Sequence, residues 1–144
     1  MIAIGCDHAG YELKKVLIEA LSEQGFEFKD MGCNGERCDY PVIAEAVCGE
    51  ITSGRCDKGI LICGTGIGMS IASNKIKGIR SALCSDCFST KYTRLHNDSN
   101  VMCLGARVIA SGLALELAEI FLRTGFEGGR HQQRIDLITE LENK

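Results

Sequence analysis

One stretch near the middle of the chain decides the fold: Gly59-Ile60-Leu61-Ile62-Cys63-Gly64-Thr65-Gly66-Ile67-Gly68-Met69-Ser70. The run from Ile60 to Ile62 is short, apolar and rich in β-branched residues, which predicts a buried strand of a parallel sheet. The glycines that follow lack Cβ atoms, so they permit a tight turn and the close approach of a ligand to the backbone. The residues from Met69 to Lys75 predict a helix. Strand, glycine loop and helix in this order form a site that attracts negative charge.

Cys63 stands where the predicted strand meets the glycine loop. The first amides of the following helix point toward the space above it, and their partial positive charge favours the thiolate over the thiol. Cys63 is therefore our candidate for a reactive base or nucleophile. The alternative is a small hydrophobic residue that ends a buried strand, which is how most free cysteines behave.

The rest of the chain alternates apolar, strand-like runs with segments of helical periodicity. The expected strands are Met1–Gly5, Phe26–Gly32, Ile60–Ile62, Ile79–Cys84 and Val101–Leu104. The expected helices are Tyr11–Gln24, Val42–Thr52, Met69–Lys75, Phe88–Leu95, Ala110–Leu122 and Arg130–Glu142. This alternation predicts a three-layer α/β/α sandwich on a five-stranded parallel sheet, Rossmann-like, in a single domain that spans residues 1–144 and ends in a helix.

Composition excludes several classes of protein. A net charge of −3 provides no electrostatic basis for nucleic acid as the main partner. No apolar stretch approaches the roughly 18 residues that a membrane span needs, and the first residues do not resemble a signal peptide. We therefore expect a soluble, cytoplasmic protein without a nucleic-acid or membrane partner.

The nine cysteines form no convincing metal motif. Cys84 and Cys87 make a lone C-x-x-C, which is typical of a dithiol or of half a zinc site. No second pair completes it, because Cys33 and Cys38 are too loosely spaced. Cysteines in apolar runs read as reduced thiols of the core: Cys6, Cys63, Cys84 and Cys103. We predict no metal.

Ligands of open parallel sheets bind outside the carboxyl ends of the strands. Three polar clusters are expected there: Asp7-His8 after the first strand, Cys63 with its loop after the third, and Arg107 after the fifth. His96-Asn97 precedes the fifth strand, and this reasoning does not place it.

Two arginines near the C-terminus suit a phosphate group. Arg130 and Arg134 are four residues apart and share one face of the last helix, where guanidinium groups can bind a phosphate in bidentate fashion. Gly128-Gly129 leaves the start of that helix open to an anion. A solvated helix face is the alternative.

The glycine loop fits three better-known motifs poorly. It resembles the dinucleotide fingerprint, but the third glycine comes one residue early, and this fingerprint usually follows the first strand. A P-loop needs a lysine followed by serine or threonine. A cysteine phosphatase needs a late arginine, where this loop has Met69 and Ser70. The loop favours a thiol that acts on a carbon acid beside anion-stabilising amides.

Together, six motifs resemble the type B ribose-5-phosphate isomerases, which are related to the allose-6-phosphate isomerases and the subunits of galactose-6-phosphate isomerase. The resemblance covers essentially the whole chain. The motifs are Gly5-Cys6-Asp7-His8-Ala9-Gly10, Asp39-Tyr40-Pro41, Gly59 to Gly68, Ala72-Ser73-Asn74-Lys75, His96-Asn97-Asp98 and Gly128-Gly129-Arg130-His131-Gln132-Gln133-Arg134.

This resemblance implies a cofactor-free aldose–ketose isomerase of the pentose phosphate pathway. It also implies a homodimer, or a dimer of dimers, with active sites at the subunit interface. Cys63 would be the base, and His96 would open the sugar ring with support from Thr65. The amides of Gly64, Thr65, Gly66, Ile67 and Gly68 would stabilise an enediolate. The sugar would be held by Asp7, His8, Tyr40 and Asn97, and the phosphate by Arg107, Arg130 and Arg134.

One branch of the family has a glutamate base at the position of Met69 and no cysteine in the loop, so this chain resembles the thiol branch. The main alternative substrate is a six-carbon aldose phosphate such as allose 6-phosphate. From other classes, a nicotinamide-dependent oxidoreductase and a non-enzymatic sugar-phosphate-binding module remain as hypotheses.

Overall fold

Five parallel strands form one sheet in the order β2-β1-β3-β5-β4. The computed structural model describes residues 1–144. The strands are β1 (Ile2–Cys6), β2 (Phe28–Asp30), β3 (Lys58–Cys63), β4 (Ser81–Leu83) and β5 (Val101–Gly105). The helices are α1 (Tyr11–Glu23), α2 (Tyr40–Thr52), α3 (Ile67–Ser73), α4 (Cys87–Asn97), α5 (Ser111–Arg123) and α6 (Arg130–Glu142), with a short 3-10 turn at His8–Gly10. The predicted α/β architecture is confirmed.

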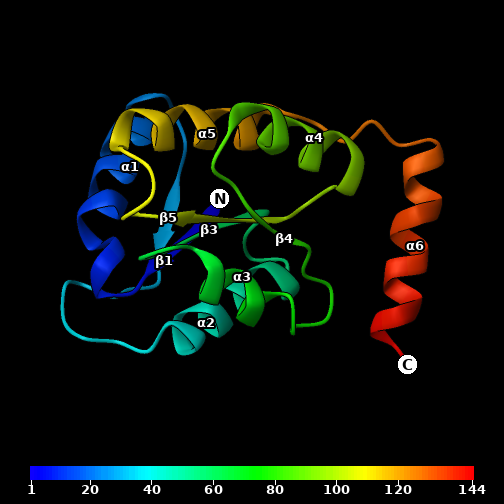
Figure 1. Ribbon diagram of the computed structural model, residues 1–144, viewed down its shortest axis with the longest axis horizontal. Helices are drawn as coiled ribbons and strands as arrows, with labels where there is room; N and C mark the ends of the chain where they lie inside the picture. The colour runs from blue at the N-terminus through cyan, green and yellow to red at the C-terminus, as the bar shows by residue number, and fades with distance from the viewer.

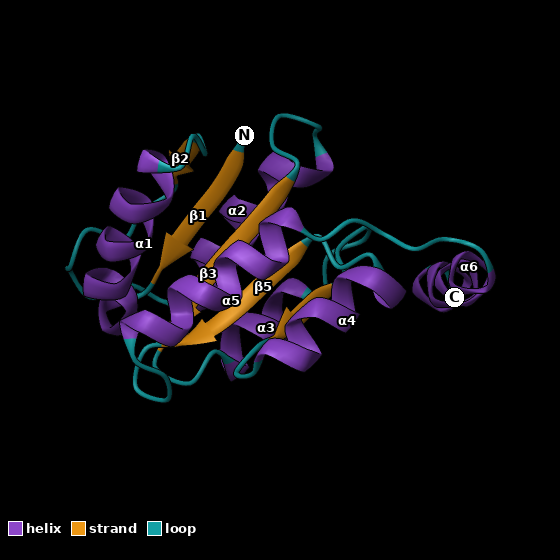
Figure 2. Ribbon diagram, turned by 90° about the horizontal axis from the view of Figure 1, so that it is seen from above, coloured by secondary structure: helices purple, strands orange, loops and turns teal.

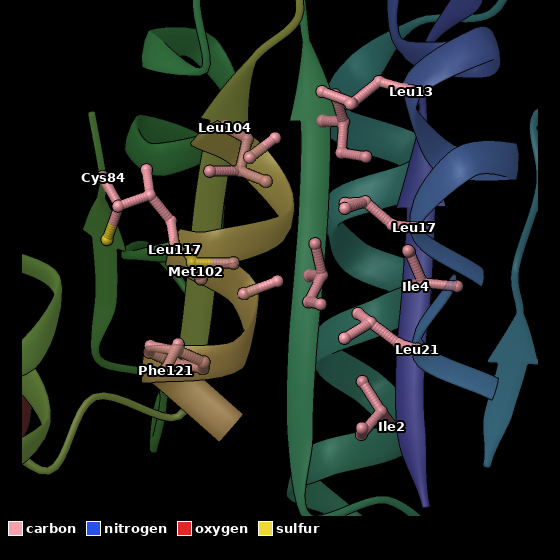
Figure 3. Packing of buried hydrophobic residues seen from close by; sticks show 14 of the residues in the cluster. Ile2, Ile4, Leu13, Leu17, Leu21, Cys84, Met102, Leu104, Leu117 and Phe121 are labelled. Carbon is pink, nitrogen blue, oxygen red and sulfur yellow. The ribbon is translucent and has the colours of Figure 1, made fainter. Parts of the chain in front are cut away.

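The helices cover the two faces of the sheet, with α1, α4 and α5 on one side and α2 and α3 on the other (Figure 1). Successive strand residues point to opposite faces. Ile60 and Ile62 of β3 therefore pack beneath α1 and α5, where Leu17 and Phe121 also lie (Figure 3). Leu61 and Cys63 pack on the other face, against α2 and α3. The alternation thus places the Cys63 side chain on the face of the sheet that α2 and α3 cover.

β1 and β3 are neighbours at the centre of the sheet. The helix after β1 covers one face, and the helix after β3 covers the other (Figure 2). Such a switch leaves a crevice outside the carboxyl ends of the two strands, the usual ligand site of open α/β sheets. Asp7 and Cys63 lie at these ends.

Several element boundaries differ from the prediction. The second strand starts at Phe28 rather than Phe26, because the Phe26 amide still bonds to the Leu21 carbonyl at the end of α1. The fourth strand is shorter than Ile79–Cys84, since the Ile79 amide closes a turn on Ile76. α2 begins at Tyr40 and accommodates Pro41 in its first turn.

The loop between β2 and α2 is closed by a disulfide between Cys33 and Cys38. The sequence pattern did not predict this pairing, because it was used only to exclude Cys33 and Cys38 as half of a metal site. The loop is also tied to the body, because the buried Lys14 ammonium bonds to the Asp30 carboxylate at 2.7 Å and to the Cys33 carbonyl at 2.8 Å. Tyr40 follows directly after this fixed loop.

α6 stands apart from the sandwich at the end of a long connector (Figures 1 and 2). It touches the body near both of its ends. The His131 ring stacks on His96, and the Glu142 carboxylate accepts the Gly78 amide at 3.1 Å. None of the helices has the length and apolar character that crossing a membrane requires.

Candidate active site

The Cys63 sulfur lies at the mouth of the glycine loop. Its Sγ accepts a hydrogen bond from the Gly66 amide at 3.1 Å, and the Ile67 amide donates to the Thr65 hydroxyl at 3.2 Å. Cys63 is only 5% exposed, so little water reaches the sulfur. A backbone donor aimed at sulfur stabilises negative charge there.

Two of the loop glycines have close neighbours at the place of a Cβ atom. Gly66 has a φ of +79°, and a Cβ there would lie 2.5 Å from Leu83 and 2.9 Å from the Leu104 backbone. A Cβ at Gly68 would lie 2.7 Å from the Tyr40 ring. The tyrosine therefore rests on the first turn of α3, beside the loop.

Arg107 and Asp7 flank the same loop. The Arg107 amide donates to the Gly64 carbonyl at 2.9 Å, and a Cβ at Gly64 would meet the guanidinium at 3.3 Å. The Asp7 carboxylate accepts the Ala9 and Gly10 amides and so caps the turn after β1. His8 is exposed on that turn. We call Asp7, His8, Tyr40, Cys63 and Arg107 the thiol edge.

His96 and Asn97 lie at the opposite edge of the sheet, where the strands begin, whereas Cys63 lies where they end. They form the last turn of α4, which leads into the amino end of β5. β5 runs parallel to β3, with Gly105 beside Cys63. Its five residues at about 3.3 Å each span roughly 16 Å. Within one chain, the structure therefore does not bring His96 or Asn97 together with Cys63.

Two arginines fix the end of α4. Arg80 donates to the Asn97 carbonyl at 2.8 Å and to the Asp98 carbonyl at 3.0 Å. The buried Arg94 donates to the Asp98 carboxylate at 2.9 Å. The Arg80 bonds satisfy carbonyls that a helix end leaves unpaired, and the Arg94 bond holds the Asp98 side chain, so the turn that carries His96 is well defined.

The His96 ring is surrounded by groups from three segments. His131 of α6 stacks on it with ring centres 4.0 Å apart and planes 15° apart, and Tyr92 meets it edge-on at 5.0 Å. The Glu127 carboxylate, from the connector before α6, lies 3.7 Å from its Nε2. Arg130 and Arg134 are exposed on the first turns of α6. We call His96, Asn97, Glu127, Arg130, His131 and Arg134 the imidazole edge.

His131 is itself unusual. It is 3% exposed, and its Nε2 has no hydrogen-bond partner. Burial lowers its pKa, and the neighbouring His96 and Arg130 lower it further, so the ring is neutral at pH 7. Its contact with His96 was not predicted from the sequence, although His131 lies within one of the six motifs. Nothing in the sequence distinguishes Glu127.

The ligand atoms of His96, Glu127 and His131 lie within 4.8 Å of one another, as in a metal site. Imidazole nitrogens, however, bind metals in the plane of the ring. Two rings stacked at 15° hold their lone pairs in two nearly parallel planes with ring centres 4.0 Å apart, so these do not converge on one ion. We assign no metal there.

Other cysteines are poor candidates for the base. Burial raises the pKa of Cys6 and Cys84 to about 11, and that of Cys48 and Cys103 to about 12. These groups stay thiols at neutral pH, as expected for core residues. Cys84 and Cys87 are both free, so the C-x-x-C is not a disulfide.

The cavities of the protomer do not join the two edges. One of about 520 Å³ lies between the body and α6, and Asn97, Ile138 and Leu141 are among its lining residues. A second, of about 200 Å³, lies on the β4 side of the glycine loop and includes Thr65 and Ile67. None of the three cavities contains Cys63 or His96.

Several proteins of known name or structure are similar to this chain over nearly its full length. Ribose-5-phosphate isomerase B of Escherichia coli is 46% identical over 99% of this chain and 97% of its own. The structure of ribose-5-phosphate isomerase B from Clostridium thermocellum matches with a TM-score of 0.96 at 44% identity, over 99% of this chain and 97% of that one. The Mycoplasma genitalium enzyme, solved with bound ribulose-5-phosphate, matches with a TM-score of 0.93 at 39% identity, over 99% and 96%.

The family model described as Ribose/Galactose Isomerase matches residues 2–138. The resemblance to type B ribose-5-phosphate isomerases is thereby confirmed across nearly the full length. The strand order, the glycine loop and these matches show that the chain belongs to the ribose/galactose isomerase family.

Proposed function

We propose that this protein interconverts D-ribose 5-phosphate and D-ribulose 5-phosphate, with Cys63 as the base. The observation that carries the proposal is the Cys63 sulfur at the carboxyl end of β3, hydrogen-bonded by the Gly66 amide at 3.1 Å. Support also comes from the relatives, which are named for this activity. In this role the protein would act in the non-oxidative pentose phosphate pathway, in the cytoplasm.

The chemistry needs a base beside a stabilised oxyanion. The Cys63 thiolate takes the proton from C2 of the open-chain aldose, and the C–H electron pair moves through C1 onto the carbonyl oxygen. A cis-enediolate results. Amides of the loop from Gly64 to Gly68 stabilise its negative oxygen, and preorganised donors of this kind contribute strongly to catalysis. Return of the proton from the Cys63 thiol to C1, together with transfer of the O2 proton to O1, gives the ketose and restores the thiolate.

The candidate binding groups for the sugar lie beside the glycine loop and at the end of the neighbouring strand. Tyr40 rests on Gly68, and Arg107 lies over Gly64. Asp7 and His8 follow the neighbouring strand β1. In this proposal Asp7, His8, Tyr40 and Asn97 hold the hydroxyls, with Thr65 in support, and the guanidinium groups of Arg107, Arg130 and Arg134 bind the phosphate.

In this proposal a second copy of the chain completes the site. His96, which we propose protonates the ring oxygen, cannot reach Cys63 of its own chain across roughly 16 Å of sheet. α6 also leaves apolar side chains uncovered: Leu137, Ile138 and Leu141 are each at least 45% exposed. Such faces are covered in oligomers. We therefore propose a homodimer in which His96, Asn97, Arg130 and Arg134 of one subunit face Cys63 of the other.

Mixing two impaired variants tests this arrangement. Cys63→Ala and His96→Ala subunits alone should each keep only a small residual activity on ribose 5-phosphate. After unfolding and refolding together, random pairing makes half of the dimers mixed, and one of their two sites is intact. About a quarter of wild-type activity should then return. No recovery, with mixed dimers shown by mass spectrometry, would overturn the shared site.

Substrate length is tested separately. We expect a higher kcat/KM for ribose 5-phosphate than for allose 6-phosphate in steady-state assays of the wild-type protein. The reverse order would favour a six-carbon substrate. Turnover of neither, with binding retained, would favour a sugar-phosphate-binding module.

A further inference from the structure

We propose that Glu127 is a positioning residue for His96. Its carboxylate holds one nitrogen of the imidazole and leaves the other free for the sugar ring oxygen. This inference rests on the proposed function, because it concerns the ring-opening step assigned to His96. Nothing in the sequence distinguishes Glu127, and its role follows from the packing of the connector between α5 and α6.

The first support is the way the backbone places Glu127. Its amide donates to the Leu95 carbonyl at 3.0 Å, one residue before His96. Three residues earlier, the Thr124 carbonyl accepts the Arg94 Nε at 3.1 Å. Both bonds join the connector to the last turn of α4, so the carboxylate and the imidazole are carried by one hydrogen-bonded unit.

The second support is the geometry around the ring. Oε2 of Glu127 lies 3.7 Å from Nε2 of His96, an ion-pair distance, while one face of the ring stacks on His131 and Tyr92 meets the ring at 75°. His131 is buried and neutral, so it fixes the ring plane by stacking without adding a charge. Glu127 is therefore the only residue that forms an ion pair with His96, whereas Arg130 and Arg134 of α6 are cations that lower the pKa of the adjacent His131.

A carboxylate at one imidazole nitrogen has two effects. It selects the tautomer and the orientation of the ring, and it stabilises the imidazolium that donates a proton. Both effects serve ring opening, which needs a proton at the ring oxygen. Neither is needed for proton transfer between C2 and C1, which takes place at Cys63.

Two substrates separate ring opening from proton transfer between C2 and C1. Ribose 5-phosphate is mostly cyclic and must open. Ribulose 5-phosphate has its O5 phosphorylated, so it cannot close a furanose ring and enters as an open chain. Exchange of its C1 proton for solvent deuterium reports enediolate formation without ring opening.

For Glu127→Gln we expect kcat on ribose 5-phosphate to fall about tenfold, which is less than the roughly 10²- to 10⁴-fold contribution of the general acid itself, because His96 remains in place. Deuterium exchange into ribulose 5-phosphate should change less than about twofold. Glu140→Gln, which removes the same charge from an exposed site on α6, is the matched control and should change neither rate. Equal losses in both reactions, or no loss in either, would overturn the proposal.

A double-mutant cycle shows whether Glu127 acts through His96. In a His96→Ala background, Glu127→Gln should have no further effect on kcat, because the group it positions is gone. An additive tenfold loss would contradict the proposal.

A spectroscopic readout keeps this inference separate from the proposed function. Long-range ¹H–¹⁵N spectra of the free protein should show the His96 ring nitrogens shifting in Glu127→Gln, whereas the matched control Glu140→Gln should leave them unchanged. An unshifted His96 would refute the role of Glu127 even if the enzyme is active. Absence of turnover by the wild-type protein would instead refute the proposed function.

Discussion

The two edges of the sheet are built by different means. At the thiol edge the main chain makes the site: the Gly66 amide meets the Cys63 sulfur, and the Asp7 carboxylate is bound by amides of its own turn. At the imidazole edge the site is made by side chains from separate elements, with His96, Glu127 and His131 brought together by packing. The first arrangement depends on local sequence, and the second on how α6 and its connector dock.

This difference predicts that removal of one atom at the thiol edge, the Cys63 sulfur, lowers kcat by a large factor. Replacement of Cys63 by alanine should lower kcat by about 10²- to 10⁴-fold, the usual contribution of a positioned base. The unfolding temperature should change little by comparison. Cys87→Ala, which removes another free thiol, is the control and should keep kcat. A Cys63→Ala enzyme with normal kcat would show that another group removes the proton.

The backbone origin of the thiol edge can be tested at Gly66. Alanine there would be strained at φ +79° and would press on Leu83 and the Leu104 backbone. We expect a loss of about 2–4 kcal/mol in the free energy of unfolding, together with lower activity. Gly112 of α5 has open space at its Cβ position, so Gly112→Ala should instead be neutral or stabilising. Urea unfolding of both variants checks the contrast.

At the imidazole edge, the expected effect of a single charge is on binding. Arg134→Ala should raise KM for ribose 5-phosphate about tenfold, since a charge-assisted bond to phosphate is lost. kcat should change less, because the phosphate is remote from the reacting carbons. Arg123→Ala removes an exposed guanidinium that bonds to Gln24 and should leave KM unchanged. An unaltered KM in Arg134→Ala would remove the arginine from the phosphate site.

The smallest effect is expected at Glu50, which belongs to neither edge. Bonds from Arg55 and Lys29 lower the Glu50 pKa to about 2. Because the folded pKa lies below the unfolded value, this group adds stability above about pH 4.5 and loses it as the pH falls toward 2. Glu50→Gln should therefore flatten the dependence of stability on pH in this window. Thermal unfolding at several pH values measures it, and wild-type and variant curves of equal slope would contradict the pairing.

What could be predicted from the sequence divides in the same way, between local patterns and contacts of residues distant in the chain. The periodicity of Leu13, Leu17 and Leu21 predicts α1, and the run from Ile60 to Ile62 predicts β3, because each pattern involves neighbours along the chain. The boundary errors at Phe26 and Ile79 arose where an amide bonds to a turn instead of the sheet. Propensity alone does not distinguish these two partners.

The sequence by itself determined the strand, glycine loop and helix around Cys63, the alternation that makes a parallel sheet, and the motifs of the family. These depend on short-range spacing and on backbone conformations open mainly to glycine. Only the tertiary structure decided that Cys33 pairs with Cys38, that Glu127 and His131 enclose His96, and that His96 lies at the edge opposite Cys63. Those outcomes depend on contacts between residues distant in sequence, which strand order and helix docking create and which local patterns do not encode.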